Sequence, residues 1–147
     1  MKISIKEEQF STELLEEMRP LFYYSYNEMD ESGLPYNPDF DVYLAAKDSA
    51  VIFTLRDEEE GNTLAGYSFY FVTQNLHSKF FKTACCGSLY VLPPYRFYSL
   101  KFMKYNFDRL HNIHGVTDIT LTIRTKFEKV MQKLGFKETG RVYTLTR

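Results

Sequence analysis

The stretch Leu89–Met103, LYVLPPYRFYSLKFM in one-letter code, decides the fold of this chain. Its first residues are apolar and end at two prolines, which is typical of a strand that stops where the chain must turn. The residues that follow place apolar side chains three and four positions apart, which predicts a helix with one apolar face made of Leu100, Met103, Phe107 and Leu110. Further along, the sequence Lys-Leu-Gly-Phe at 133–136 marks the end of another helix.

This strand, the arginine after it and the helix, with Gly135 and Phe136 behind them, resemble the central motif of the GNAT superfamily of N-acetyltransferases. In that family the loop after the arginine reads Arg-x-x-Gly-x-Gly or Ala. Small residues there let backbone N–H groups at a helix N-terminus surround a pyrophosphate. The resemblance implies acetyl-CoA as co-substrate and direct attack of an amine on its thioester. Glu28, Pro38–Tyr43 and His77 extend the likeness to the acetyltransferase-like proteins of tailed bacteriophages.

The resemblance assigns two groups of residues to acetyl-CoA. The edge of the strand would pair with the pantetheine arm at Tyr90, Val91 and Leu92. The loop would hold the pyrophosphate at Arg96, Phe97, Tyr98, Ser99, Leu100 and Lys101. Ser99 and Lys101 stand where Gly or Ala is usual: the Ser99 hydroxyl can donate to a phosphate, whereas Lys101 either adds a cation or blocks the backbone. The other interpretation is an ordinary first turn of an amphipathic helix, with Arg96 as a surface residue.

Acetyl transfer needs a base for the amine and often an acid for the leaving thiolate. The family's usual positions are vacant here, because the strand 82–91 has no carboxylate, Gly87 stands where the phage-type proteins often have Asp, and Met131 stands where a tyrosine is usual. Three replacements are candidates: Glu28 as base, His77 as a group that titrates near neutrality, and Tyr143 as proton donor. Each also has a plain structural interpretation: a solvated helix-end carboxylate, an exposed loop histidine and a tyrosine packed on a sheet.

Alternation of apolar and polar residues, turn signals and capping patterns predict the order of the elements. We expect strands at 3–5, 50–56, 64–73, 83–92 and 116–123, and closing strands within 136–147; helices are expected from Thr12, over 39–46 and 98–114, and from a capping box at 125–128 to Leu134. This order matches the GNAT fold, an α/β (α+β) fold. It implies a mixed, mostly antiparallel twisted sheet of six or seven strands flanked by four helices.

The composition predicts one domain, residues 1–147, large enough to bury a core without disulfides or metals. A formal net charge of -1 argues against a general nucleic-acid binder and leaves small phosphorylated ligands open. Cys85 and Cys86 are adjacent in a strand, so their side chains point to opposite faces and we expect no disulfide between them. No stretch is apolar enough for a membrane span or a signal peptide, and we expect a cytoplasmic protein. His111 and His114 lack the further ligands of a zinc site, so no metal is expected.

The sequence therefore predicts an acetyl-CoA-dependent N-acetyltransferase that acts on an amine of a small molecule or a protein. The alternative is a catalytically inactive protein of the same fold that binds a protein partner through the aromatic cluster of Phe22, Tyr23, Tyr24 and Tyr26. Such a module would serve a phage against its host, or be a component of the virion. The oligomeric state is not predicted.

Overall fold

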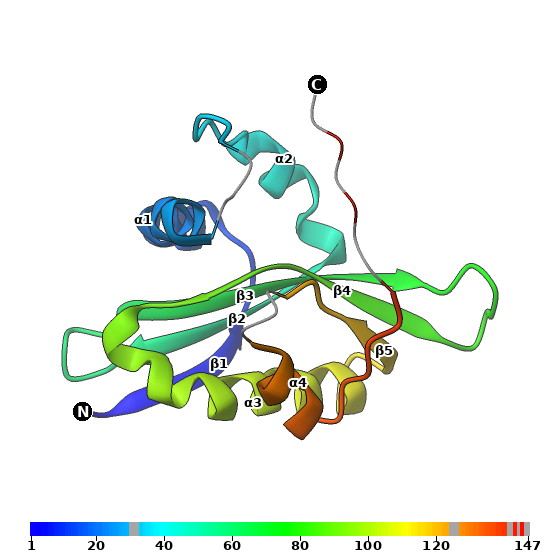
Figure 1. The fold of residues 1–147 in the computed structure, drawn as a ribbon. Coiled ribbons are helices and arrows are strands. Elements are labelled where there is room, and N and C mark those ends of the chain that lie inside the picture. Colours follow the sequence, from blue (N-terminus) through cyan, green and yellow to red (C-terminus); the bar gives the residue numbers. More distant parts are fainter. Residues whose placement is uncertain (30–32, 124–126, 141–142, 144, 146–147) are drawn as a thin grey trace.

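The computed structural model describes residues 1–147 except 30–32, 124–126, 141–142, 144 and 146–147. Its centre is a five-stranded sheet in the order β1-β2-β3-β4-β5 (Figure 1). The strands are β1 (Ile3–Glu8), β2 (Ala50–Asp57), β3 (Thr63–Gln74), β4 (Lys82–Val91) and β5 (Val116–Thr120). The first four strands pair with one another in antiparallel fashion, and β5 runs parallel to β4.

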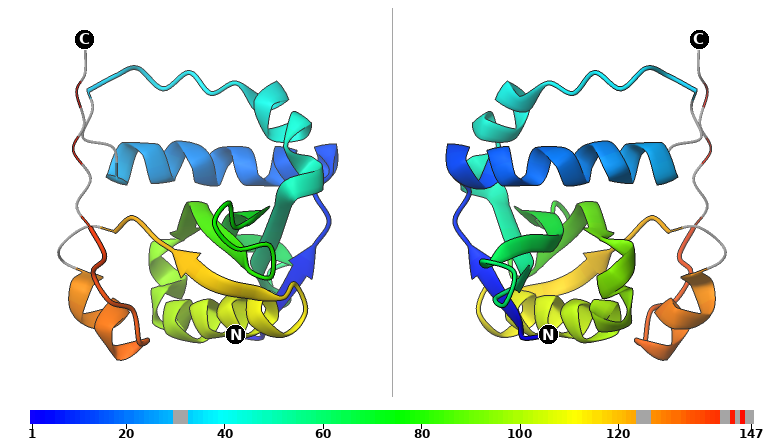
Figure 2. Two further views of the ribbon diagram at one scale, coloured as in Figure 1. Left: turned by 90° about the vertical axis from the view of Figure 1, so that its right-hand side faces the viewer. Right: turned by 90° about the vertical axis from the view of Figure 1, so that its left-hand side faces the viewer.

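Helices cover both faces of this sheet (Figure 2). The helices α1 (Thr12–Met29) and α2 (Phe40–Ala45) lie on one side, and α3 (Ser99–Asn112) and α4 (Glu128–Lys133) lie on the other. Two short 3-10 helices, η1 (Lys47–Ser49) and η2 (Pro93–Tyr98), lead into β2 and α3. The predicted mixed, mostly antiparallel sheet with four helices is thus confirmed.

The predicted number of strands is wrong for the part of the chain that the structure describes. We expected six or seven strands, with closing strands in 136–147, but residues 136–140, 143 and 145 form none, and β5 ends at Thr120 rather than at 123. A segment with alternating apolar and polar residues becomes a strand only if a neighbouring strand accepts and donates its backbone hydrogen bonds. The sequence of the segment itself does not show whether such a neighbour exists. The remaining residues of 136–147, and Thr125 of the expected capping box, lie outside the described chain.

Each face of the sheet has its own apolar core because α1 and α3 are amphipathic. The helix α1 begins where the N–H of Leu14 donates to the Oγ of Ser11 at 3.1 Å. It buries a stripe against one face of the sheet at Leu14, Leu15, Met18, Leu21 and Phe22. The helix α3 buries Phe102, Met103, Phe107 and Leu110 against the other face. Gly115, at φ +67°, ends the turn after α3 as predicted for a glycine at a helix C-terminus.

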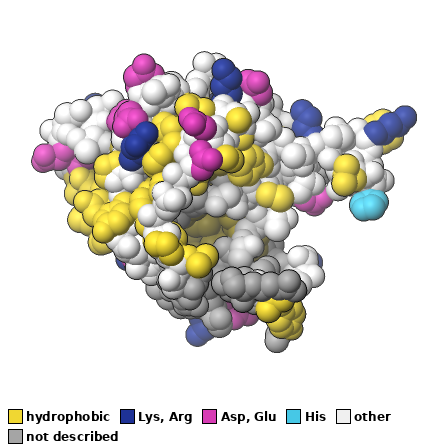
Figure 3. Space-filling model, turned by 90° about the horizontal axis from the view of Figure 1, so that it is seen from above, with side chains coloured by type: hydrophobic (Ala, Val, Ile, Leu, Met, Phe, Trp, Pro, Cys, Tyr) yellow, Lys and Arg dark blue, Asp and Glu magenta, His cyan; other side chains and the backbone are white. Residues whose placement is uncertain are grey.

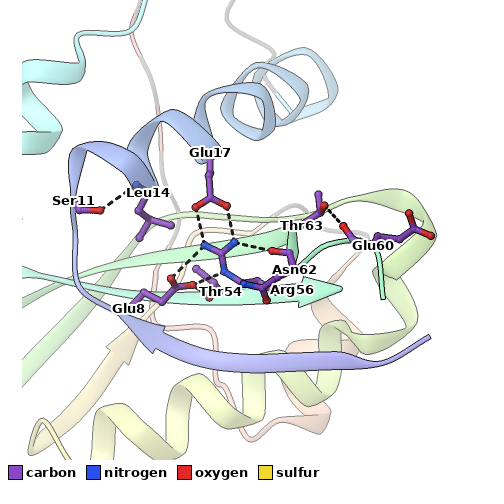
Figure 4. A network of polar contacts seen from close by, with 9 residues as sticks. All are labelled: Glu8, Ser11, Leu14, Glu17, Thr54, Arg56, Glu60, Asn62 and Thr63. Atoms are coloured by element: carbon purple, nitrogen blue, oxygen red, sulfur yellow. Dashed lines mark hydrogen bonds and ion pairs between the residues drawn. The ribbon is translucent and has the colours of Figure 1, made fainter. Parts of the chain in front are cut away.

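A buried arginine joins β1, α1 and the β2–β3 turn (Figure 4). The Arg56 side chain is only 4% exposed. Its Nε donates to Glu8 at 2.7 Å, and its Nη1 donates to Glu17 at 2.6 Å and to the Asn62 carbonyl at 3.0 Å. Thr54 adds a hydrogen bond to Glu8. This polar network ties the first half of α1 to β1 and β2.

Candidate active site

The strand β4 changes direction at Gly87. Phe69 pairs with Ser88 and Tyr70 pairs with Cys86, so Gly87 is an extra residue between two ladder positions and forms a β-bulge. A Cβ at this position would lie 2.9 Å from Cε2 of Phe71, which is closer than carbon atoms tolerate. A side chain at the bulge would have to push the Phe71 ring aside, so the position favours glycine.

The bulge coincides with the point where β4 and β5 part. Their parallel pairing runs from Lys82 opposite Val116 to Cys85 opposite Thr120. Within the described chain, residues 86–91 of β4 have no partner on the β5 side. The strand edge at Tyr90 and Val91, where the resemblance places pantetheine, is therefore open in the sense that no described strand pairs with it.

The expected pyrophosphate loop is divided between two helices. Residues 96–98 belong to η2, and residues 99–101 form the first turn of α3. The N–H of Tyr95 donates to the carbonyl of Leu92 at 2.9 Å, and the N–H of Ser99 donates to the carbonyl of Arg96. Phe97 is exposed and stacks on Tyr98 with 3.9 Å between ring centroids. The N–H groups that α3 offers to an anion therefore come from the residues after Ser99.

Three predicted site residues from three elements meet beside this loop. The Nη2 of Arg96 donates to both carboxylate oxygens of Glu28, at 2.6 and 2.5 Å, and the hydroxyl of Tyr90 donates to the same carboxylate at 2.9 Å. The Nε of Arg96 donates to the carbonyl of Val91 at 3.2 Å. Burial, and then the hydrogen bond to Glu28, raise the pKa of Tyr90; the hydrogen bond with Glu28 raises the pKa of Arg96. Tyr90 thus stays protonated and Arg96 charged at neutral pH.

The other two catalytic candidates lie away from this cluster. His77 is an exposed residue of the β3–β4 loop, which joins the opposite end of β4 from Tyr90. Its backbone N–H donates to the Oδ1 of Asn75 at 2.8 Å. Tyr143 is 88% exposed in the C-terminal segment. Of the three candidates, Glu28 is the one that the structure brings to the residues proposed to bind CoA.

A pair of hydroxyl groups near the bulge was missed by the sequence analysis. Tyr67 of β3 is fully buried, and its hydroxyl lies 2.7 Å from the Oγ of Ser88, the residue after Gly87. Burial raises the pKa of Tyr67, so its hydroxyl keeps its proton. Ser88 and Tyr90 are two residues apart on one strand and share a face of the sheet. A serine within an otherwise apolar strand was the signal that could have found it.

The aromatic cluster of α1 is only partly a surface. Phe22 lies in the core, with its ring 4.9 Å from the Tyr67 ring and 5.2 Å from the Tyr43 ring. Tyr23 and Tyr24 are half exposed. The helical period explains the difference, because Phe22 falls on the buried stripe and the two tyrosines after it do not. Seen from above the view of Figure 1, the surface mixes hydrophobic and acidic side chains with a few basic ones, and a hollow that contains hydrophobic side chains lies near its middle (Figure 3).

Two cavities in the described chain lie away from the pyrophosphate loop. A cavity of about 480 Å³ lies at the far end of the sheet, beside Asp48, Gln74, Lys82 and His114. A larger one, about 720 Å³, lies between the end of β5, α4 and residues 136–140, and its apolar lining includes Leu121, Ile123, Met131 and Phe136. A cavity of this size can hold part of a cofactor-sized ligand. Met131, at the place expected of an acid, contributes only apolar surface to it.

The described residues contain no cluster of His, Cys, Asp or Glu that could hold a metal ion. His111 Nδ1 contacts the carbonyl of Val116 at 2.6 Å, and His114 Nε2 contacts Glu7 at 2.8 Å, so both histidines have structural partners. Both cysteines are free thiols. Among the helices described, none is long and apolar enough to cross a membrane.

Solved structures of acetyltransferases share the fold. An aminoglycoside acetyltransferase from an uncultured soil metagenomic sample superposes with a TM-score of 0.76 at 13% identity, over 100% of this chain and 99% of its own. Glucosamine-6-phosphate N-acetyltransferase from Arabidopsis thaliana gives 0.69 at 14% identity, over 97% and 98%. AAC(6')-Iy, in complex with the bisubstrate analog CoA-S-monomethyl-acetylneamine, gives 0.68 at 20% identity, over 98% of both chains. No family model and no curated protein sequence matches. The chain thus has the acetyltransferase fold from end to end.

Proposed function

We propose that this chain is an acetyl-CoA-dependent N-acetyltransferase of the GNAT superfamily, acting on an amine of a small molecule or a protein. The observation that carries the proposal is the open edge of β4 after the bulge at Gly87, in a chain with the acetyltransferase fold. A free strand edge can pair with the amides of an extended ligand whatever its own side chains are. Pantetheine, with its two amides, is such a ligand.

The charges around the start of α3 suit the phosphates of CoA. No Asp or Glu occurs in the sequence from Gly61 to Phe107, whereas Arg96, Lys101 and Lys104 lie in or near the first turns of η2 and α3. The N-terminal end of a helix carries unpaired N–H groups and a positive partial charge. Lys101 is exposed, which favours the interpretation that it adds a cation beside the phosphates over the one in which it blocks the backbone.

In this proposal Glu28 is the base and Tyr90 holds it in place. Bound acetyl-CoA supplies a thioester carbonyl as electrophile. Glu28 takes a proton from the amine, the nitrogen forms a bond to the carbonyl carbon, and the carbon–sulfur bond breaks. The sulfur takes up a proton, and we propose that the Ser88 hydroxyl donates it, with the Tyr67 hydroxyl hydrogen-bonded to Ser88. Solvent then removes the proton from Glu28 and returns one to Ser88.

Titration of acetyl-CoA and CoA by calorimetry and thermal shift tests the proposal. A ligand present at a hundred times its Kd stabilises the folded state by about 2.7 kcal/mol, so a working site must raise the Tm at millimolar ligand. Absence of any shift would refute the transferase. If binding is seen, Ser99→Glu should abolish it by placing negative charge against a phosphate. The matched control is Asn112→Glu, which adds the same charge at the other end of α3 and should leave the affinity unchanged.

The second candidate function is a non-catalytic module that binds a protein. The vacant family positions at Gly87 and Met131 favour it, as do the half-exposed rings of Tyr23 and Tyr24. The likeness to phage proteins belongs to this candidate as a prediction from sequence. The same titration separates the two, because a module that has lost its cofactor site gains no stability from CoA.

A further inference from the structure

One guanidinium engages both halves of the proposed active site. Through Nη2, Arg96 holds the Glu28 carboxylate, at 2.5 and 2.6 Å, and through Nε it donates to the Val91 carbonyl at 3.2 Å. Val91 lies on the open edge proposed for pantetheine, and Glu28 is the proposed base. The same side chain therefore occupies an atom of the proposed cofactor edge and both oxygens of the proposed base.

The arrangement is one that a diphosphate can disrupt. The side chains of Arg96 and Glu28 are 45% and 34% exposed, so their ion pair competes with water and is weak. Only one guanidinium nitrogen, Nη2, contacts the Glu28 carboxylate, so the pair lacks the two-pronged geometry that a guanidinium can form with phosphate oxygens. A diphosphate also offers more negative charge than a carboxylate. Arg96 lies one turn before Ser99, the first residue of α3, where the proposed phosphate site begins.

We infer that Arg96 is a positioning residue that exchanges Glu28 for the diphosphate of CoA, and that this exchange releases the Glu28 carboxylate to the acceptor amine only after CoA has bound. The inference rests on the proposed function and adds an order of binding to it. Before the exchange, hydrogen bonds from Arg96 occupy the lone pairs that would accept the amine proton. After it, Tyr90 still donates to Glu28 and keeps the carboxylate at the site.

The exchange predicts that neutralising the Glu28 carboxylate increases the affinity of the protein for CoA. In Glu28→Gln, Arg96 no longer has an anionic partner to give up, so CoA should bind about two- to fivefold more tightly, as the strength of an exposed ion pair implies. Arg96→Gln should weaken CoA binding. In the double variant the gain from Glu28→Gln should disappear, because it acts through Arg96. Glu13→Gln, an exposed neutralisation on the same helix, should leave the affinity unchanged.

Isothermal calorimetry with CoA on the four variants and the wild type measures these effects, with circular dichroism to confirm that each is folded. If the wild type does not bind CoA, the proposed function fails. If the wild type binds and Glu28→Gln binds equally or more weakly, the exchange is wrong and the transferase stands. If Glu28→Gln tightens binding equally with Arg96→Gln present, Glu28 repels the phosphates directly, which also overturns the exchange.

Discussion

Replacing Arg56 by Met should be among the most destabilising changes outside the apolar cores. The variant removes the cation that Glu8 and Glu17 share, while the Met side chain keeps most of the volume (Figure 4). Glu17 is 44% exposed and can be hydrated, but Glu8 is only 22% exposed and is left without its counter-charge. Breaking a buried ion pair from one side costs 3–5 kcal/mol, and partial exposure puts this case at the lower end, about 3 kcal/mol.

That loss corresponds to a Tm lower by about 10 °C, because unfolding entropy scales with chain length and amounts to about 0.3 kcal/mol per kelvin for a chain of this size. Urea unfolding and calorimetry measure both quantities. Adding Glu8→Gln to the variant should recover part of the loss, since the stranded charge is then removed. Lys2→Met, which breaks an exposed pair with Glu58, is the control and should leave the Tm unchanged. A loss below about 1 kcal/mol in Arg56→Met would refute the reasoning.

Three further predictions concern β4 and the acidic limb of stability. Gly87→Ala should lower the free energy of unfolding by about 1 kcal/mol, because its Cβ meets the Phe71 ring, and Phe71→Leu should restore it; urea unfolding of both variants decides this. Burial raises the pKa of Cys86 to about 12, so iodoacetamide should label the exposed Cys85 in the native protein and spare Cys86, and mass spectrometry showing equal labelling would contradict the burial. Burial alone would raise the pKa of Glu8, but hydrogen bonds in the Figure 4 network outweigh it and lower the pKa below 4.5. A carboxyl whose pKa is lower in the folded state than in the unfolded state stabilises the fold above pH 4.5, and this stability is lost as the pH falls through its pKa in the folded state. In Glu8→Gln the free energy of unfolding should therefore fall less steeply between neutral and acidic pH.

The antiparallel part of the sheet could be predicted from the sequence because its connections are local. The strands from 50 to 91 follow one another through short loops, so apolar runs bounded by turn signals are enough to locate each of them. The helices α2 and α3 were predicted for the same reason. The closing strands were predicted wrongly, because Phe136 and its neighbours have no partner strand in the described chain.

The sequence identified several residues of the candidate site, but it did not predict which of them contact one another. The motif identified Tyr90 and Arg96, and the position of Glu28 at a helix end suggested a base. Their hydrogen bonds join residues more than sixty positions apart, which no local pattern reports. The bulge at Gly87 also depends on registers with β3, so the sequence indicated a missing carboxylate there and not a bend.

The pairing between β4 and β5 is shorter than the other strand pairings, so the local stability of the sheet is expected to be lower at β5. The strands β1 to β4 pair with one another along most of their length, whereas β5 pairs with β4 only from Lys82 to Cys85. Segments secured by few ladder bonds open locally at a lower free energy than the whole domain unfolds. We therefore expect the backbone amides of β5 to exchange with solvent deuterium faster than those at the centre of β2 and β3, because β5 can separate from β4 without unfolding the rest of the sheet.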